Sequence, residues 1–490
     1  CMITEIRKVP ITEEARPFAT ALKVCPLEEL GYAEEEYFQS GTANVYREEE
    51  EVPVVEIPDA PYTTRLLIRR PKDPKKFSGN VVIEILNASA MMDIDRIWVN
   101  CWRYFTRHGD IYIGITSKGH VVDALKAYDP QRYAPINWAN PNPNRVPCDE
   151  VKNSRFGFLP QYEQGLFWDM LLDLAKILRT ESPMNPIADC GKAWLYLTGW
   201  SQSGAYLSRV VNTFAYLPEN CQNGPLFDGY LDAGSGASNA PINSYEPFST
   251  PFRKGRPTAS LLCTKEPCIA INTESENRST FWYGNFDEPN CKFRTWQIPC
   301  SSHDNRYNLV DYYHLGYGTE SLHRLGRDMD WEGYQGEALN TPYHFIFHAA
   351  FDALYHWVRD GIPAPYAPKI ITEMTYGPTD PTGVQVANRT DSFGNALGGI
   401  RYPAADCPTS VCQSYTLRKD GGIQQMFGTE FPFSSERLNA IYGDIGHYRT
   451  LVEKSVDNAV AHGWILADDR EALIEASVET AKQRGLSCEI

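Results

Sequence analysis

A serine near the middle of the chain has the neighbours that a strained catalytic turn requires. Residues 194–204 read WLYLTGWSQSG, with the small residues Gly199 and Ser203 two positions before and after Ser201. Apolar residues then recur at helical spacing through 207–214. A strand, a sharp turn and a helix in this order form a nucleophile elbow, whose central side chain points outward. The pattern predicts Ser201 as a nucleophile, although Ser203 departs from the common G-x-S-x-G and an ordinary serine-rich turn is the alternative.

A nucleophilic serine needs a base to take its proton, and in chain order the base follows the last core strand. Residues 293–299 alternate in the manner of such a strand, and His303 follows them closely. The competing histidines His344, His348 and His356 lie on or beside one predicted helix. Because no H-E-x-x-H accompanies them, we expect packing and surface roles there. His303 is therefore the predicted base.

The base needs a carboxylate that orients it, and two lie in one turn after a predicted strand at 268–272. Glu276 stands four residues beyond the strand, which is a usual reach toward the histidine, and Glu274 stands closer. Glu276 is the predicted acid. Glu274 is the alternative, and its other role would be to brace the turn by accepting backbone N–H bonds. Asp232, after the preceding strand, is a third candidate.

Two backbone N–H groups must hold the negative charge that develops on the substrate oxygen. One is expected from Gln202, directly after the nucleophile, and the other from the turn after a strand at 80–86, at Asn87 or Ala88. The side chain of Asn87 could assist, or it could cap the helix that follows.

The chain is acidic, with 62 acidic and 46 basic residues and a formal net charge of −16. Such a surface repels phosphate backbones, so we expect no nucleic-acid partner. No apolar run approaches the ~18 residues that span a bilayer, so no transmembrane segment is expected. The first residues are not a signal peptide, which favours the cytoplasm. A secreted or lipid-anchored form is the alternative if Cys1 is the first residue of a processed chain.

The 13 cysteines have no metal-binding or redox spacing, because none forms C-x-x-C. No metal and no organic cofactor are expected. Three pairs close in sequence would permit local disulfides, or could be buried free thiols: Cys263/Cys268, Cys291/Cys300 and Cys407/Cys412.

Strands alternate with helices over much of the chain, which favours an α/β fold with a mainly parallel sheet covered by helices. The strands are predicted at 64–69, 80–86, 111–116, 227–233, 268–272 and 293–299. The helices are predicted around 98–105, 167–178 and 345–359, with a helix pair at 435–486.

We expect one domain over residues 1–490, with additions at both ends. Residues 1–60 form an N-terminal extension and residues 364–490 a C-terminal embellishment. Residues 304–343 are predicted to form a cap or pocket wall, because they are dense in aromatics and histidines: Tyr307, Tyr312, Tyr313, His314, Tyr317, His323 and Trp331. Aromatic walls favour a bulky or aromatic apolar substrate.

Several motifs resemble those of the α/β-hydrolase domain-containing proteins of bacteria and fungi that carry a G-[YW]-S-Q-S-G elbow. Besides the elbow these are the EILNAS segment at 84–89, the LKAYDPQRY block at 125–133, the NTESE turn at 272–276, the SHD at 302–304 and the GGIRYP block at 398–403. The resemblance covers nearly the whole chain. It implies an α/β-hydrolase fold, to which residues 304–343 would add a cap insertion.

The resemblance also implies hydrolysis of a small-molecule carboxylic ester through an acyl-enzyme. Ser201 would attack, His303 would act as base and then acid, and Glu276 would orient His303. An acyltransferase or lactonase with the same triad is an alternative. A catalytically silent binding protein on the same fold is another, which a complete set of serine, acid and histidine disfavours.

Overall fold

The structure is a computed structural model of the 490-residue chain. It describes residues 2–21, 25–50, 52–152, 159–236, 238–247, 252–253, 256–257, 264–311, 335–376, 384–421, 423–424 and 426–488. The chain divides into two compact units. The described part of the first lies within Cys1–Cys268 and Glu288–Lys292, and that of the second within Ile269–Asp287, Phe293–Asp311 and Met329–Ile490.

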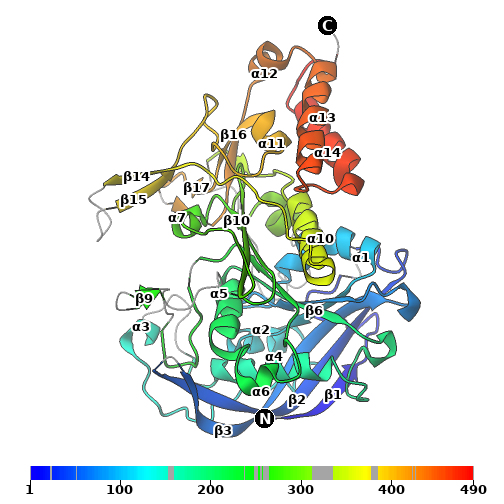
Figure 1. The fold of residues 1–490 in the computed structure, drawn as a ribbon, viewed down its shortest axis with the longest axis vertical. Coiled ribbons are helices and arrows are strands. Elements are labelled where there is room, and N and C mark those ends of the chain that lie inside the picture. Colours follow the sequence, from blue (N-terminus) through cyan, green and yellow to red (C-terminus); the bar gives the residue numbers. More distant parts are fainter. Residues whose placement is uncertain are drawn as a thin grey trace. The chain divides into compact units, whose positions relative to one another are not determined.

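The first unit is built on a twisted sheet (Figure 1). Its strands are neighbours in the order β1 (Met2–Val9), β2 (Tyr32–Glu49), β3 (Val52–Pro71), β5 (Ile111–Ile115), β4 (Asn80–Ile85), β6 (Trp194–Trp200) and β7 (Gly229–Ala233). The pairs β4–β5, β4–β6 and β6–β7 are parallel, whereas β1, β2 and β3 are antiparallel neighbours. β4 and β5 are buried at every position, as parallel strands covered on both faces must be.

Helices cover this sheet where their apolar faces meet it. α1 (Arg96–His108) packs on β5 and β6, α4 (Phe167–Ile177) on β1 and β2, and α5 (Gln202–Arg209) on β4, β6 and β7. α1 ends at Gly109, whose φ of 90° is open to glycine and rarely to other residues. The shorter segments are η1 (Pro74–Lys76), η2 (Gly119–Val121), α2 (Val122–Tyr128), α3 (Asp149–Lys152), η3 (Gln164–Leu166), η4 (Ala188–Cys190), η5 (Val210–Phe214), α6 (Pro218–Cys221), β8 (Phe252–Arg253) and β9 (Arg256–Pro257).

The second unit contains the adjacent strands β10 (Cys268–Thr273), β12 (Cys291–Ile298) and β11 (Phe286–Glu288). The long helix α10 (His344–Asp360) buries Phe347, Phe351 and Leu354. Short elements follow: α7 (Asn277–Thr280), η7 (Arg306–Asp311), β13 (Glu337–Ala338), β14 (Thr372–Tyr376), β15 (Val384–Asn388), α11 (Pro403–Asp406), β16 (Ser410–Gln413), β17 (Thr416–Leu417), β18 (Ile423–Gln424) and β19 (Thr429–Pro432).

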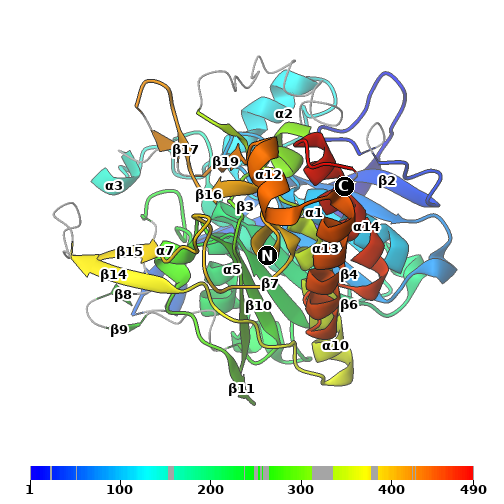
Figure 2. The ribbon, with the colours of Figure 1, turned by 90° about the horizontal axis from the view of Figure 1, so that it is seen from above.

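The C-terminal helix pair that we predicted is wrong in number, because three helices are present (Figure 2). They are α12 (Ser435–Tyr442), α13 (Ile445–Ala461) and α14 (Arg470–Gln483), with η8 (Ala467–Asp469) before the last. Gly443 at φ 75° ends α12, and Asp444 begins α13 by accepting the N–H of His447 at 2.8 Å. Gly443 and Asp444 therefore separate two helices, although the spacing of the apolar residues alone predicts one continuous helix.

The predicted strands are present, with different ends. The strand predicted at 64–69 is the last part of β3, and residues 1–60 supply β1, β2 and half of β3. The acidic character of this region hid its strands, because Glu34 and Glu36 are buried rather than solvated. Their carboxylates bind arginines of β3, which removes the cost of burying them unpaired.

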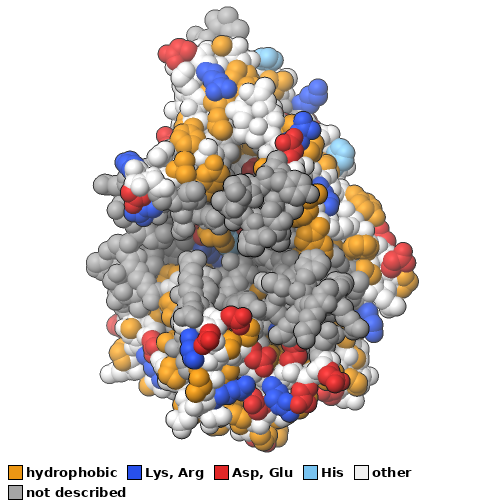
Figure 3. Space-filling view, turned by 90° about the vertical axis from the view of Figure 1, so that its left-hand side faces the viewer, with side chains coloured by type: hydrophobic (Ala, Val, Ile, Leu, Met, Phe, Trp, Pro, Cys, Tyr) orange, Lys and Arg blue, Asp and Glu red, His pale blue; other side chains and the backbone are white. Residues whose placement is uncertain are grey.

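On the face drawn in Figure 3, acidic and basic groups lie beside one another along the lower part. No described helix combines the length and the apolar character that crossing a bilayer requires.

A buried ion network links β2, β3 and the turn after α2. Glu36 accepts Nε of Arg65 at 2.5 Å, Nε of Arg132 at 2.5 Å and the hydroxyl of Tyr133 at 2.9 Å. Arg65 also donates to Asp93 at 3.1 Å. Each buried charge in the network has a partner of opposite sign, so removing one member leaves another buried charge with fewer partners.

Glu36→Ala should lower the free energy of unfolding by about 3–5 kcal/mol, because it leaves two buried guanidinium groups with one carboxylate fewer. Chemical denaturation measures the loss. Glu28→Ala is the control, since Glu28 pairs with Lys72 at the exposed surface, and it should change stability little. Equal effects of the two substitutions would contradict the assignment.

Candidate active site

The predicted strand, turn and helix around Ser201 are present. β6 ends at Trp200, α5 begins at Gln202, and Ser201 between them has φ 61° and ψ −122°. Its N–H donates to the carbonyl of Ala233 at 2.9 Å, and its own carbonyl accepts the N–H of Gly204 at 2.9 Å. A non-glycine residue at positive φ is strained, and nucleophile elbows have this conformation. Ser201 is partly exposed, as a nucleophile must be.

Two glycines make this turn possible. A Cβ on Gly199 would lie 2.4 Å from the carbonyl oxygen of Ser203, and a Cβ on Gly204 would lie 2.4 Å from Oδ1 of Asp232. At Gly199 the strand and helix backbones approach too closely for a side chain, and at Gly204 the side chains of Asp232 and Ser235 take the space. Ser203 itself is buried and its hydroxyl is hydrogen-bonded, which explains why it replaces the usual glycine without opening the turn.

The turn after β4 lies against the elbow. Nδ2 of Asn87 donates to the carbonyl of Trp200 at 2.9 Å, and Oδ1 of Asn87 accepts the N–H of Ser89 at 2.9 Å. Asn87 and Ile94 exchange two backbone hydrogen bonds of 2.9 Å, which close the turn. Among the described residues, none accepts a hydrogen bond from the backbone N–H of Ala88 or Gln202. Asn87 thus uses its side chain to hold the turn, and Ala88 and Gln202 have N–H groups to offer a ligand.

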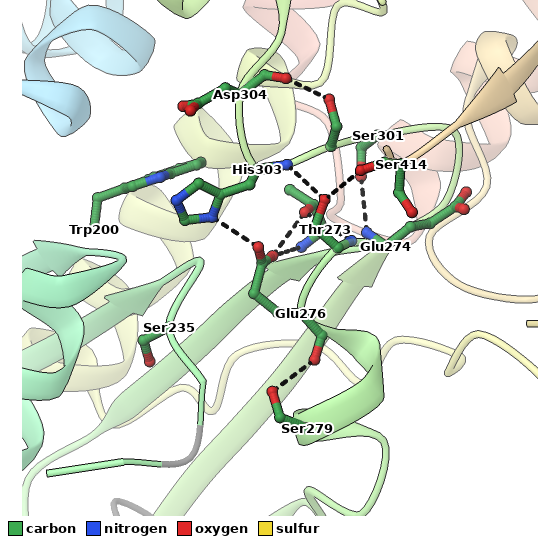
Figure 4. Close-up of polar contacts among 12 residues, drawn as sticks. Trp200, Ser235, Thr273, Glu274, Glu276, Ser279, Ser301, His303, Asp304 and Ser414 are labelled. Atoms are coloured by element: carbon green, nitrogen blue, oxygen red, sulfur yellow. Dashed lines mark hydrogen bonds and ion pairs between the residues drawn. The ribbon is translucent and has the colours of Figure 1, made fainter. Parts of the chain in front are cut away.

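In the second unit, Glu276 and His303 form a buried pair (Figure 4). Oε1 of Glu276 lies 2.7 Å from Nδ1 of His303. Oε2 of Glu276 accepts the N–H and the hydroxyl of Thr273 at 2.8 and 2.7 Å, and the backbone N–H of His303 donates to the hydroxyl of Ser275 at 3.0 Å. The carboxylate and the imidazole are both fixed in orientation. Thr273 and Ser275, which we had not singled out, supply this support.

Glu274 points to a different partner. Its Oε1 accepts the backbone N–H of Cys300 at 2.5 Å, and its Oε2 accepts Nδ2 of Asn388 at 3.4 Å. Cys300 has φ 53°, so Glu274 holds a strained residue three positions before His303. Burial raises the pKa of Glu274 to about 7. The geometry is that of a brace for the histidine loop.

The third candidate acid and the other histidines have their own contacts. Asp232, in the first unit, accepts the hydroxyl of Ser235 at 2.5 Å. Nδ1 of His348 lies 2.7 Å from Asp469, and Nδ1 of the exposed His356 lies 2.6 Å from Asp360. Within the described residues no group of three or more His, Cys, Asp or Glu side chains is arranged to hold a metal ion.

Several predicted features fall on parts of the chain that are not described. Residues 312–334, which form most of the predicted cap and include Tyr312, Tyr313, His314, Tyr317, His323 and Trp331, lie outside the described residues, and so does Cys263. Cys291, Cys300, Cys407 and Cys412 are free thiols, so neither the 291/300 nor the 407/412 disulfide is formed.

A mainly parallel sheet flanked by helices, with a strained serine turn after its strand β6, is the architecture of an α/β hydrolase. Residues 7–475 match the family described as alpha/beta hydrolase domain. This match covers nearly the whole chain, and the protein belongs to that family. No curated protein matches it.

Solved structures that match this chain include hydrolases of distant sequence. Fungal esterases from Rhizomucor miehei share 11% identity over 60% of this chain and 83% of theirs, with a TM-score of 0.31. A hyperthermophilic esterase from the archaeon Pyrobaculum calidifontis shares 10% over 48% of this chain and 72% of its own, with a TM-score of 0.29. A siderophore hydrolase from Aspergillus nidulans shares 13% identity over 57% of this chain and 76% of its own, with a TM-score of 0.25.

The raised pKa of Glu274 predicts a pH dependence of stability. The unfolded glutamate loses its proton near 4.5, whereas the folded one keeps it up to about 7. Between these values the folded state binds more protons, so the contribution of Glu274 to the free energy of unfolding falls as pH rises. Glu274→Gln should remove this fall, because the amide does not titrate.

Denaturation of wild type and variant between pH 4.5 and pH 7 measures the difference. Glu479→Gln, on the exposed face of α14, is the control and should keep the wild-type slope. Parallel curves for Glu274→Gln and wild type would show that Glu274 does not titrate in this way.

Proposed function

We propose that this protein is a serine esterase, which hydrolyses a small-molecule carboxylic ester through an acyl-enzyme. Ser201 is the nucleophile, His303 the base, and Glu276 the orienting acid. The backbone N–H groups of Gln202 and Ala88 form the oxyanion hole, and the side chain of Asn87 holds the turn that carries Ala88. The proposal needs no metal and no organic cofactor.

The observation that carries this proposal is the 2.7 Å contact between Nδ1 of His303 and Glu276. A carboxylate on Nδ1 holds the proton there and leaves Nε2 as the basic nitrogen. It also stabilises the imidazolium that forms when Nε2 takes a proton. The carboxylate of Glu276 is itself held by two further hydrogen bonds from Thr273, which supports the orienting role proposed for it.

The reaction follows from these roles. Nε2 of His303 takes the hydroxyl proton of Ser201 as Oγ attacks the ester carbonyl, and the oxyanion hole holds the resulting negative charge. The imidazolium then gives its proton to the departing alcohol, which leaves the acyl group on Oγ. Water, deprotonated by the same nitrogen, releases the carboxylic acid and restores Ser201.

The same acyl-enzyme could pass its acyl group to an alcohol, or open a cyclic ester. An acyltransferase would form a new ester when alcohols are added, and a lactonase would release a single hydroxy acid. A binding protein on the same fold would do none of these and would not react with a fluorophosphonate. The strained backbone of Ser201 favours an enzyme, because strain of this kind is retained where a side chain must be presented.

The proposed substrate is bulky or aromatic, because residues 304–343 contain many aromatic side chains that could line its pocket. A series of p-nitrophenyl esters with graded acyl size, together with esters of graded alcohol size, would define the preference.

Ser201→Ala should abolish hydrolysis of p-nitrophenyl esters and labelling by a fluorophosphonate, since both require the Oγ nucleophile. Ser203→Ala should be slower but retain measurable turnover and labelling, because the hydroxyl of Ser203 is buried and bonded to the Leu86 carbonyl rather than presented to a substrate. Initial rates and mass spectrometry of the labelled peptide test both. Activity lost in Ser203→Ala and kept in Ser201→Ala would move the nucleophile by two residues.

Glu276→Gln should fold and lose about 10²–10⁴-fold in kcat, because His303 loses its orienting charge. Glu274→Gln should keep kcat much closer to the wild-type value, since Glu274 contacts Cys300 rather than His303. Steady-state kinetics on one ester separates the two variants, which differ by two positions in the same turn. A near-wild-type kcat for folded Glu276→Gln would reassign the acid.

A further inference from the structure

A buried lysine lies between the elbow and the turn after β4, and the proposed reaction gives it no role. Lys118 follows β5 and is only 1% exposed. Its Nζ donates to the hydroxyl of Ser117 at 2.8 Å and to the hydroxyl of Ser203 at 3.3 Å. Nζ also lies 4.0 Å from the ring centroid of Tyr206, on α5.

The two hydroxyls that accept hydrogen bonds from Lys118 both donate hydrogen bonds to the same backbone oxygen. Ser117 donates to the carbonyl oxygen of Leu86 at 2.6 Å, and Ser203 donates to the same oxygen at 3.1 Å. Lys118, Ser117, Leu86 and Ser203 therefore form a closed ring of four hydrogen bonds. The ring joins the end of β4, the segment after β5 and the first turn of α5, and Leu86 is its only backbone acceptor.

The position of Leu86 gives this ring its importance. Leu86 precedes Asn87 and Ala88, and Asn87 is bonded to the carbonyl of Trp200, next to Ser201. The ring at Leu86 and the Asn87 amide thus hold the turn against the elbow, in addition to the two backbone hydrogen bonds with Ile94 that close it. Neither contact uses the N–H of Ala88. A shift of this turn would move that N–H relative to the N–H of Gln202.

The charge of Lys118 has little other compensation. Asp93 is the acid that acts on it electrostatically, and the carboxylate of Asp93 already accepts Arg65 at 3.1 Å and the hydroxyl of Thr116 at 2.5 Å. Burial lowers the pKa of Lys118 to about 7. An apolar side chain of similar length would fill this space without a desolvation cost, so packing alone does not account for an amine here.

We propose that Lys118 is a positioning residue, which acts through the hydroxyls of Ser117 and Ser203 to fix the Leu86 carbonyl and so hold the Ala88 N–H in the oxyanion hole. This inference rests on the proposed esterase function. It also explains why position 203, where the elbow usually has glycine, holds a serine. The hydroxyl of Ser203 links the ring to α5.

The test is a double-mutant cycle with Lys118→Met and Ser203→Ala, measured on a p-nitrophenyl ester. Each single variant should lower kcat by about 10–50-fold, less than the ~10²–10³-fold that removal of an oxyanion donor costs, because the donor remains but is less well placed. KM should change less than about twofold, since ground-state binding does not depend on this N–H. The rate of fluorophosphonate labelling should fall in parallel with kcat.

The double variant should be no slower than the slower single variant, because both substitutions break the same ring. Lys192→Met replaces an exposed lysine of the first unit and is the matched control, with unchanged kcat. Circular dichroism and denaturation confirm that each variant is folded. If Lys118→Met does not fold, Ser203→Ala and Ser117→Ala, which keep the amine, carry the test.

Unchanged kcat in folded Lys118→Met and Ser203→Ala, or rate losses that simply multiply in the double variant, would overturn the inference. A loss of stability with wild-type kcat would do the same, since it would leave Lys118 a structural role alone. Failure of the proposed function is distinguishable, because the wild type itself would then neither hydrolyse the ester nor be labelled at Ser201.

Discussion

The close approach of β6 and α5 is the constraint on which the first unit's candidate site depends. Because the carbonyl of Ser203 would lie 2.4 Å from a Cβ at position 199, the turn can form only with glycine there. That approach forces Ser201 to φ 61° and leaves the N–H of Gln202 at the beginning of a helix, without an intrahelical acceptor. Strain, exposure of the hydroxyl and an available donor therefore have one cause. A looser turn would lose all three together.

Burial of charge differs between Glu36 in the sheet and the two charged groups beside the proposed catalytic segments, Glu274 and Lys118. Glu36 is buried with arginines on both sides, so its charge is neutralised locally and serves the sheet. Glu274 and Lys118 are buried with mainly uncharged hydrogen-bond partners. Burial raises the pKa of Glu274 and lowers that of Lys118, in both cases to about 7. Such groups are costly to fold. Each stands beside a proposed catalytic segment, Glu274 at the histidine loop and Lys118 at the elbow.

The elements that carry the candidate site were predictable because each has a local cause. β-Branched residues at 81–83 predict a strand, and Gly199 predicts a tight turn, without any knowledge of distant contacts. The N-terminal strands were harder to predict, since Glu34 and Glu36 mark a strand as exposed until the arginines of β3 are known. The break at Gly443 and Asp444 was missed because apolar residues continue with helical spacing on both sides. Lys118 had no sequence signal beyond its place after a strand, because its role depends on two hydroxyls and a carbonyl from three segments.

The two glutamates of the turn after β10 show why a carboxylate's role is set by its acceptor geometry and not by its type. Glu276 receives the Thr273 N–H and hydroxyl on one oxygen, so its other oxygen is directed at Nδ1 of His303. Glu274 receives the N–H of Cys300 and an amide of Asn388, and no hydroxyl directs it toward the imidazole. The first arrangement directs a carboxylate oxygen at the imidazole. The second arrangement fixes a carboxyl at the loop that carries His303, and burial raises the pKa of that carboxyl to about 7. One turn thus holds both the partner of the histidine and the support of the loop that carries the histidine.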